Sequence, residues 1–206
     1  MRAAGWTRLA GRVLGAVLAF SQLPGCALVS PAPVEIRKEV LNKMPPVPQR
    51  SSRGAVLLVL PPQTRPIYDT TQMAYATQPY EIAYFSQHEW AETPAQMLQP
   101  LLVKTLQNTN FFSAVLAPPY SGRYGYALRT EVRELIADFT SEPAALQLSL
   151  RFQLSDGAAG RLVAIKEVSI REPMLKKTPY AGVVAANEAT AKALLELTRF
   201  VLDKAR

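Results

Sequence analysis

The sequence predicts a single α/β domain in which a mixed, mostly antiparallel twisted sheet carries two helices on one face. Residues 55–60 form a continuous apolar run, typical of a strand buried on both faces. Residues 124–138 alternate apolar and polar side chains, and with 144–154 and 162–171 they predict an antiparallel meander. Residues 183–204 repeat apolar side chains at helical spacing. Helices packed on one face of a sheet bury the apolar side of all these elements.

The first part of the domain is expected to consist of strands. Residues 34–41 lie between prolines and alternate in part, which favours an edge strand over a short helical turn. Residues 55–60 end at two prolines and predict the central strand. Residues 73–75 and 80–85 are rich in strand-forming side chains and predict a hairpin.

A helix is predicted to begin after Thr93. The Thr93 hydroxyl can accept a hydrogen bond from a free amide, and Pro94 at the first helical position loses no helical bond. Pro100 is expected to bend or locally break the helix, because it lacks an amide proton and clashes with the preceding turn. The helix should end near residues 108–110, before a short strand at 111–116.

Two further elements complete the domain. The turn at 156–160 contains Gly157 and Gly160, which can supply the positive φ that a hairpin turn needs. The final helix, at 183–204, has an apolar stripe that includes Ala186 and Leu197, with charged residues opposite.

Residues 1–25 have the features of a secretory signal peptide. Three arginines precede the apolar run 13–20, which is shorter than the about 20 residues that span a bilayer. The sequence Leu-Pro-Gly before Cys26 resembles the lipobox of bacterial lipoproteins. The resemblance implies that Cys26 becomes the N-terminus and carries acyl chains such as palmitate. Ala27 after it implies delivery to the periplasmic face of the outer membrane.

The predicted organisation is a signal peptide at 1–25, a lipidated Pro-rich segment at 26–53 and a domain at 54–206. Removing the signal leaves 181 residues, enough for one core, and its three arginines lower the net charge from +7 to +4. Basic residues are interspersed with acidic ones, so no nucleic-acid partner is expected. Cys26 is the only cysteine, which excludes an intramolecular disulfide.

Little in the sequence indicates catalysis. His88 is the only histidine, has no second ligand residue at metal-binding spacing, and is expected in a loop at the end of the hairpin. Gly54 stands alone, and no glycine-rich phosphate loop is found. We therefore expect neither enzymatic activity nor a metal ion or cofactor.

Aromatic side chains are concentrated between residues 68 and 90. Tyrosine and tryptophan are enriched in interfaces, because they combine a large apolar area with a polar tip. Packing in the core is the simpler explanation, and a partner-binding or lipid-facing surface is the alternative. The residues assigned to such a surface are Ile67, Tyr68, Tyr80, Tyr84 and Trp90.

Several motifs together resemble a known family. They are the lipobox, the proline after the strand at 55–60, the Ile67-Tyr68-Asp69 segment, the strand at 80–85, and Trp90-Ala91-x-x-Pro94 before the helix. They resemble the auxiliary lipoprotein component of ABC-type transport systems over most of the chain after Cys26. The resemblance implies an α/β domain similar to the N-terminal domain of TolB. It also implies an ABC permease, an ATPase and a substrate-binding protein with an MCE domain as partners.

These observations favour an outer-membrane-anchored accessory lipoprotein. By the resemblance, it would serve an MCE-type system that moves phospholipids or other hydrophobic molecules between membranes, with a docking role. One alternative is a periplasmic lipid carrier that binds an acyl chain between helix and sheet, and another is a general envelope-assembly lipoprotein. Edge strands and a ring-shaped partner are also compatible with a homo-oligomer.

Overall fold

The computed structural model describes residues 35–157 and 159–205. Cys26 and the predicted signal peptide lie outside the described residues. The compact unit begins at Glu35, so residues 35–53, which we expected to precede the domain, belong to it. The elements in chain order are β1 (Arg37–Glu39), β2 (Val56–Val59), β3 (Gln63–Thr64), the 3₁₀ helix η1 (Pro66–Tyr68), β4 (Gln72–Ala76), β5 (Ala83–Trp90), α1 (Pro94–Gln107), β6 (Ala114–Leu116), β7 (Tyr126–Asp138), β8 (Ala145–Asp156), β9 (Leu162–Pro173) and α2 (Pro179–Lys204).

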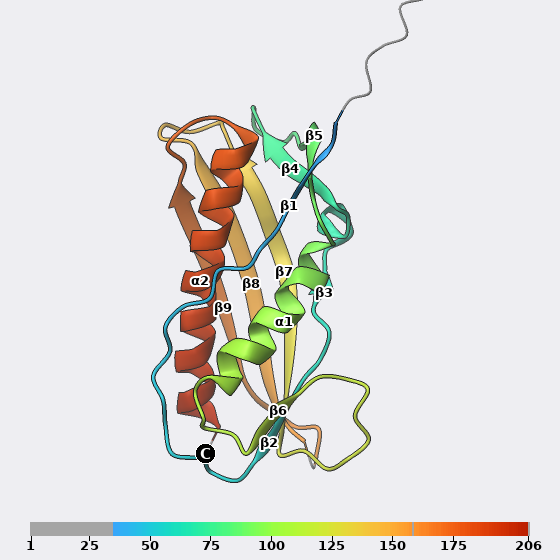
Figure 1. Cartoon of the computed structure of the whole chain (residues 1–206), viewed down its shortest axis with the longest axis vertical. Helices are drawn as coiled ribbons and strands as arrows, with labels where there is room; N and C mark the ends of the chain where they lie inside the picture. Colours follow the sequence, from blue (N-terminus) through green and yellow to red (C-terminus); the bar gives the residue numbers. More distant parts are fainter. Residues whose placement is uncertain (1–34, 158, 206) are drawn as a thin grey trace, which may run out of the picture. The chain divides into compact units, whose positions relative to one another are not determined.

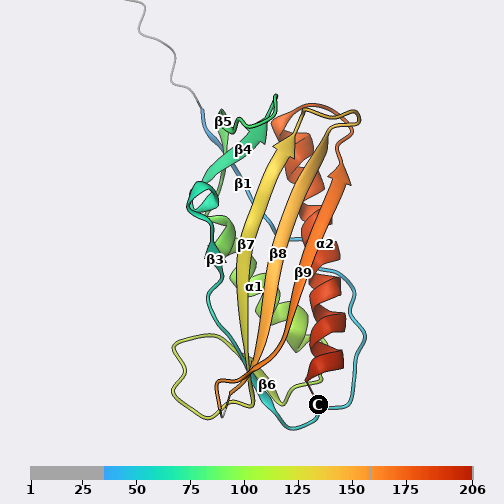
Figure 2. The same cartoon turned by 180° about the vertical axis from the view of Figure 1, so that it is seen from behind.

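The predicted antiparallel meander is confirmed. Strands β7, β8 and β9 contain 13, 12 and 12 residues and pair antiparallel along almost their whole length (Figure 2). In the β8–β9 turn, Gly160 has the positive φ of 63° that only glycine adopts easily. Gly157 is required for a different reason, because a Cβ there would lie 2.2 Å from the carbonyl oxygen of Tyr124.

The other edge of β7 is bordered by three short parallel strands from one stretch of chain. β2 pairs with the start of β7, β3 with its middle and β4 with its end. The sheet is therefore mixed, as predicted, and most of its residue pairs are antiparallel because β7, β8 and β9 are long. The apolar strand β2 lies between β7 and the short strand β6, so it is buried but is not the centre of the sheet.

The predicted hairpin forms from β4 and β5, which pair antiparallel. β5 begins at Ala83 rather than at Tyr80, which lies in the turn with a φ of 69°. His88 lies within β5 and not in a loop, because this strand continues to Trp90 to pair with β1. Strand β1 pairs parallel with the outer edge of β5, which confirms the predicted edge strand.

Helix α1 begins and ends where the sequence predicts. The Thr93 hydroxyl accepts a hydrogen bond from the Gln96 amide, and Gln96 Oε1 accepts one from the Thr93 amide at 3.0 Å. The helix continues through Pro100, so the expected break does not occur. Pro100 and Gln96 are both exposed, so water can bind the Gln96 carbonyl that proline leaves without a donor.

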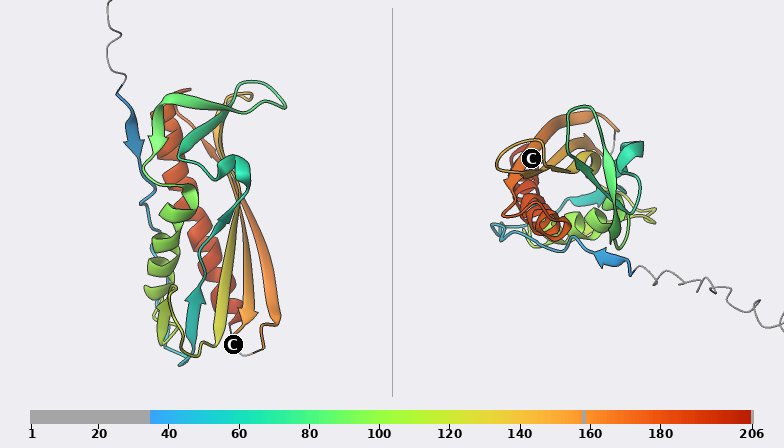
Figure 3. Two further views of the ribbon diagram at one scale, coloured as in Figure 1. Left: turned by 90° about the vertical axis from the view of Figure 1, so that its right-hand side faces the viewer. Right: turned by 90° about the horizontal axis from the view of Figure 1, so that it is seen from above.

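Helix α2 begins at Pro179, four residues before the predicted start, because the Thr178 hydroxyl caps it through the Ala181 amide. Both helices lie on one face of the curled sheet, as Figures 1 and 3 show. Small buried side chains, mainly alanines, line the side of α2 that packs on the sheet. Within the described residues, no helix combines the length and apolar character needed to cross a membrane.

Candidate functional site

A short platform, residues 62–69, lies on the edge of β7 opposite β8. Strand β3 holds its first half, and the Arg65 amide donates to the Val132 carbonyl at 3.1 Å. Pro66 then starts the 3₁₀ turn η1, where its fixed φ is already helical. The Tyr68 amide closes this turn by donating to the Arg65 carbonyl at 2.8 Å.

Tyr68 anchors the platform to the sheet face that lies away from the helices. Its side chain is 6% exposed and packs with Ala74 and Ile136 in a small apolar cluster separate from the main core. The Tyr84 hydroxyl donates to the Ile67 carbonyl at 2.9 Å and ties the β4–β5 hairpin to the same turn. Ile67 itself remains 37% exposed, so the turn presents an apolar side chain from a fixed backbone.

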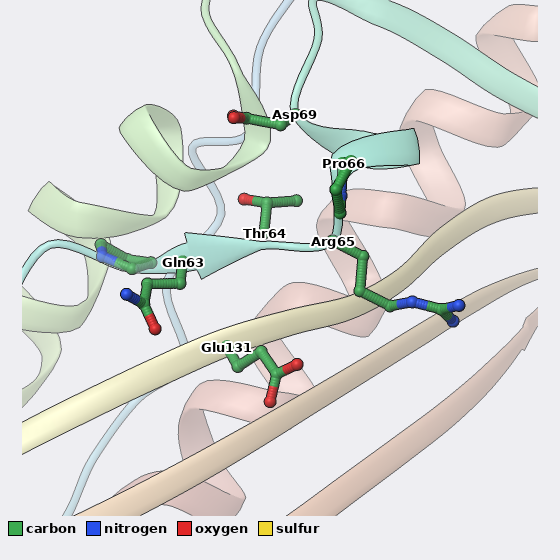
Figure 4. Close-up of a pocket in the computed structure, with 7 residues that line it drawn as sticks. Gln63, Thr64, Arg65, Pro66, Asp69 and Glu131 are labelled. Atoms are coloured by element: carbon green, nitrogen blue, oxygen red, sulfur yellow. The ribbon is translucent and has the colours of Figure 1, made fainter.

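The platform borders an open cavity of about 540 Å³ (Figure 4). Arg65, Asp69 and Glu131 supply its charged groups. The Thr64 hydroxyl is buried at this site and has no hydrogen-bond partner within the described part of the chain. The remaining lining residues are Pro62, Gln63 and Pro66. This shallow, mixed surface is typical of a site for a protein segment and unlike an enclosed small-molecule pocket.

The groups beneath the platform are electrostatically coupled. Burial, and to a smaller extent the Glu134 carboxylate, raise the pKa of Tyr68 to about 12, although Arg65 opposes both. Burial also raises the pKa of Glu134, against the effect of Arg65. Arg65 therefore stabilises negative charge at the edge of the platform.

Asp138 closes the adjacent β7–β8 turn. Burial alone would raise its pKa, but hydrogen bonds from Thr140, Gln147 and Ser141 outweigh burial and lower it. The Thr140 hydroxyl and the Gln147 amide donate to the two carboxylate oxygens at 2.6 and 2.8 Å. These bonds fix the turn that follows β7.

The candidate residues predicted from the sequence separate into three places. Ile67, Tyr68 and Tyr84 come together at the platform. Tyr80 lies in the β4–β5 turn and is fully exposed. Trp90 is 3% exposed in the main core. The side chains of Trp90 and Tyr68 are thus not on the surface, because each fills an apolar cluster, and they can only support a partner surface from beneath.

Sequence reasoning missed Arg65 and Glu131. They are 66 positions apart in the sequence and line the same cavity only because β3 pairs in parallel with β7. Neither residue stands in a motif that would have marked it.

His88 has a structural partner. Its Nδ1 lies 3.0 Å from Glu39 Oε1, and both side chains are 15% exposed. The pair joins β5 to β1, at the N-terminal end of the described chain. Within the described residues, no group of three or more histidine, cysteine, aspartate or glutamate side chains could hold a metal ion.

The second notable feature is the N-terminal strap, residues 35–53, which runs along the helices (Figure 1). Leu41 is 5% exposed, and its amide lies 3.4 Å from the Met97 sulfur on α1. Lys43 forms an ion pair with Glu188 on α2. Farther along, the Arg50 amide donates to the Thr109 carbonyl at 2.7 Å. The strap is thereby fixed to both helices.

Comparison with known proteins gives a consistent picture. The family model of the ABC-type transport auxiliary lipoprotein component matches residues 40–198. The crystal structure of protein XCC0632 from Xanthomonas campestris has a TM-score of 0.70, with 23% identity, covering 82% of this chain and 96% of its own. A crystal structure of an uncharacterized protein has a TM-score of 0.62, with 16% identity, covering 80% and 99%. No curated protein matches significantly. The structural likenesses confirm the predicted α/β fold, whereas the likeness to the N-terminal domain of TolB stays a prediction.

Proposed function

Because the chain belongs to the family of ABC-type transport auxiliary lipoprotein components, we propose that it is a non-catalytic accessory subunit of an MCE-type transport system. In this proposal Cys26 is acylated and, with Ala27 after it, anchors the protein at the periplasmic face of the outer membrane. The system would move phospholipids or other hydrophobic molecules between membranes. The domain would dock on the MCE-domain substrate-binding protein or on the ABC permease complex.

The observation that carries this proposal is the strap between the anchor position and the helices. Residues 35–53 begin nine positions after Cys26 and are bound to α1, α2 and β5. A pull on the lipid at Cys26 would therefore be resisted by the many contacts between the strap and the folded domain. Such an attachment suits a protein that must hold a partner within reach of a membrane.

The platform is the surface that we assign to the transport partner. A fixed 3₁₀ turn presents the exposed side chain of Ile67 next to the cavity that Arg65 and Glu131 line, and Tyr68 and Tyr84 hold that turn in place. An apolar anchor with charged groups around it is the usual composition of an energetically important interface site.

The packing of the core favours docking over lipid carriage. The space between helices and sheet, where an acyl chain would have to bind, is occupied by fully buried side chains such as Leu98, Leu102, Leu150 and Leu194. A closely packed protein interior does not admit an acyl chain unless its side chains rearrange. Mass spectrometry of the purified protein tests this point, since a stoichiometric bound lipid would favour carriage.

Cross-linking from membranes tests the docking proposal. We expect the acylated wild type to cross-link to an MCE-domain protein or a permease, and Ile67→Glu to reduce the yield about tenfold or more, the loss typical of an interface hot spot. Ile165→Glu is the matched control, because Ile165 is an isoleucine of similar exposure (41% against 37%) on β9. An equal loss in both variants, or no such partner for the wild type, would contradict the proposal.

Anchoring has its own test. Cys26→Ser should release the protein from the outer-membrane fraction, and metabolic palmitate labelling should be lost. Retention of the serine variant in that fraction would argue against the anchor.

A further inference from the structure

We propose that the end of the domain from which the strap leaves is a membrane-contacting surface, with Tyr80 and Leu175 as its leading side chains. This surface, the tether-side surface, consists of the β4–β5 turn, the β9–α2 loop, the first two turns of α2 and Ile36. Its occupant is the phospholipid bilayer that holds the lipid of Cys26. The inference rests on the proposed acylation and adds which end of the domain faces the bilayer.

Three chain segments meet at this end of the fold. The Phe139 amide donates to the Ala76 carbonyl at 2.9 Å, which joins the β7–β8 turn to the β4–β5 turn. Lys177 forms an ion pair with Glu142 at 2.5 Å, which joins the β9–α2 loop to the same β7–β8 turn. Figures 1 and 2 show these turns together at one end of the sheet, with the start of α2 beside them.

The described chain also begins at this end. Strand β1 pairs in parallel with β5, and β5 follows directly from the β4–β5 turn. Glu35 and Ile36, which precede β1, therefore lie on the side of that turn. The described chain thus begins at the same end of the domain as the exposed turns.

Large apolar side chains are most exposed here. Tyr80 is 109% exposed and Leu175 is 98% exposed, and Tyr180 on α2 follows at 64%. They are the three most exposed large apolar side chains among the described residues. Ile36, Val184 and Ile82 add smaller exposed areas at the same end. Exposed apolar tips on loops are costly in water and are the groups that enter the headgroup region of a membrane.

The charges around these tips suit a lipid headgroup layer. Lys176 and Lys177 follow Leu175 directly; Lys176 is exposed, Lys177 is paired with Glu142, and Glu81 beside Tyr80 accepts a hydrogen bond from Gln78. Basic side chains beside apolar tips are attracted to anionic headgroups while the tips enter the apolar boundary.

The length of the tether excludes the opposite end. Nine peptide units separate Cys26 from Glu35, which extends at most about 30 Å. Helix α2 contains 26 residues and is about 40 Å long, and it runs from the tether-side surface towards the other end. If the far end lay on the bilayer, Glu35 would be farther from the membrane than the tether reaches.

A single-thiol experiment tests this orientation in the acylated full chain. Acylation blocks the Cys26 thiol, so Leu175→Cys provides one free thiol for an environment-sensitive dye. The labelled protein is reconstituted into vesicles of phosphatidylethanolamine and phosphatidylglycerol that contain a lipid-borne quencher. Ser121→Cys, in the exposed loop between β6 and β7 at the far end, is the matched control.

We expect a blue shift and strong quenching for the dye at position 175, and neither at position 121. Equal responses at both positions, or quenching at position 121 alone, would overturn the orientation. Labelling of two thiols per chain would show instead that Cys26 is not acylated, which is a failure of the proposed function and is distinguished by mass.

Vesicle flotation separates the bilayer from a protein partner. In the non-acylated Cys26→Ser chain, the double change Tyr80→Glu and Leu175→Glu should weaken vesicle binding about tenfold or more, because two apolar tips are lost. Both side chains are exposed, so the melting temperature should not change. If the double variant keeps vesicle binding but loses the cross-link to the MCE-domain protein, the surface belongs to that partner and the inference is wrong.

Discussion

The side chain of Asn187 accepts a hydrogen bond from the backbone amide of Asn42 at 2.9 Å, across 145 positions of sequence. The same oxygen accepts from the Lys43 amide at 3.1 Å, and the Asn187 amide donates to the Val40 carbonyl at 2.9 Å. One side chain on α2 therefore satisfies three backbone groups of the strap. Asn187 is the main polar link between the N-terminal strap and α2.

Asn187→Ala should release the strap. Three backbone groups would lose their partner, and the free energy of unfolding should fall by about 1–3 kcal/mol. Urea denaturation measures the loss, and amide hydrogen exchange should rise at Asn42 and Lys43. Glu188→Ala is the control on the next residue, because its exposed ion pair with Lys43 contributes at most about 1 kcal/mol. Equal losses would contradict the role of Asn187.

Pro100→Ala should stabilise the protein. Alanine restores an amide donor for the exposed Gln96 carbonyl, and proline in a helix interior costs about 3 kcal/mol relative to alanine. The greater entropy of the unfolded chain offsets about 0.4–1 kcal/mol of this gain. We expect a net increase of about 2 kcal/mol, measured by thermal and urea denaturation. Lys104→Ala, also exposed on α1, should change stability by less than about 0.5 kcal/mol.

Asp138→Asn should make the free energy of unfolding less dependent on pH in the acid range. The folded-state pKa of Asp138 is lowered, so its contribution is present above the unfolded-state pKa of about 3.9 and is lost as pH falls through the folded-state pKa. At pH 7 the variant should be less stable by about 2 kcal/mol, since bonds to a charged carboxylate are lost. The difference should shrink below about pH 4. A difference independent of pH would contradict this assignment, and Asp69→Asn controls for the loss of one negative charge.

Tyr68→Phe should remove an alkaline titration. Burial raises the folded-state pKa of Tyr68 to about 12, so the stability it contributes is full below the unfolded-state value of 10 and is lost as pH rises from 10 to 12. As the pH is raised, the tyrosinate absorbance of the wild type should include a component that titrates near pH 12, and the variant should lack it. Tyr80→Phe, at a fully exposed position, should leave that component unchanged.

Local sequence determined the elements whose stabilising groups are close together along the chain. Thr93 and Pro94 specify the start of α1, because the cap bonds an amide three residues away. The alternation of 124–138 specified β7 and the meander, since strands joined by short turns pair with their neighbours. The lipobox, the Ile67-Tyr68-Asp69 segment, the Trp90-Ala91-x-x-Pro94 motif and the strands around them together predicted the family.

Tertiary structure decided what depends on distant partners. β5 extends to Trp90 and places His88 within a strand because its end pairs with β4 on one edge and with β1, some 50 residues away, on the other. The cavity at the platform exists because β3 pairs with the middle of β7, which brings Arg65 and Glu131 into one lining. The aromatic residues between 68 and 90 differ in burial: Trp90 lies in the main core, Tyr68 is buried beneath the platform and Tyr80 is exposed. Composition cannot separate these roles, since each depends on which side chains cover it after the chain has folded.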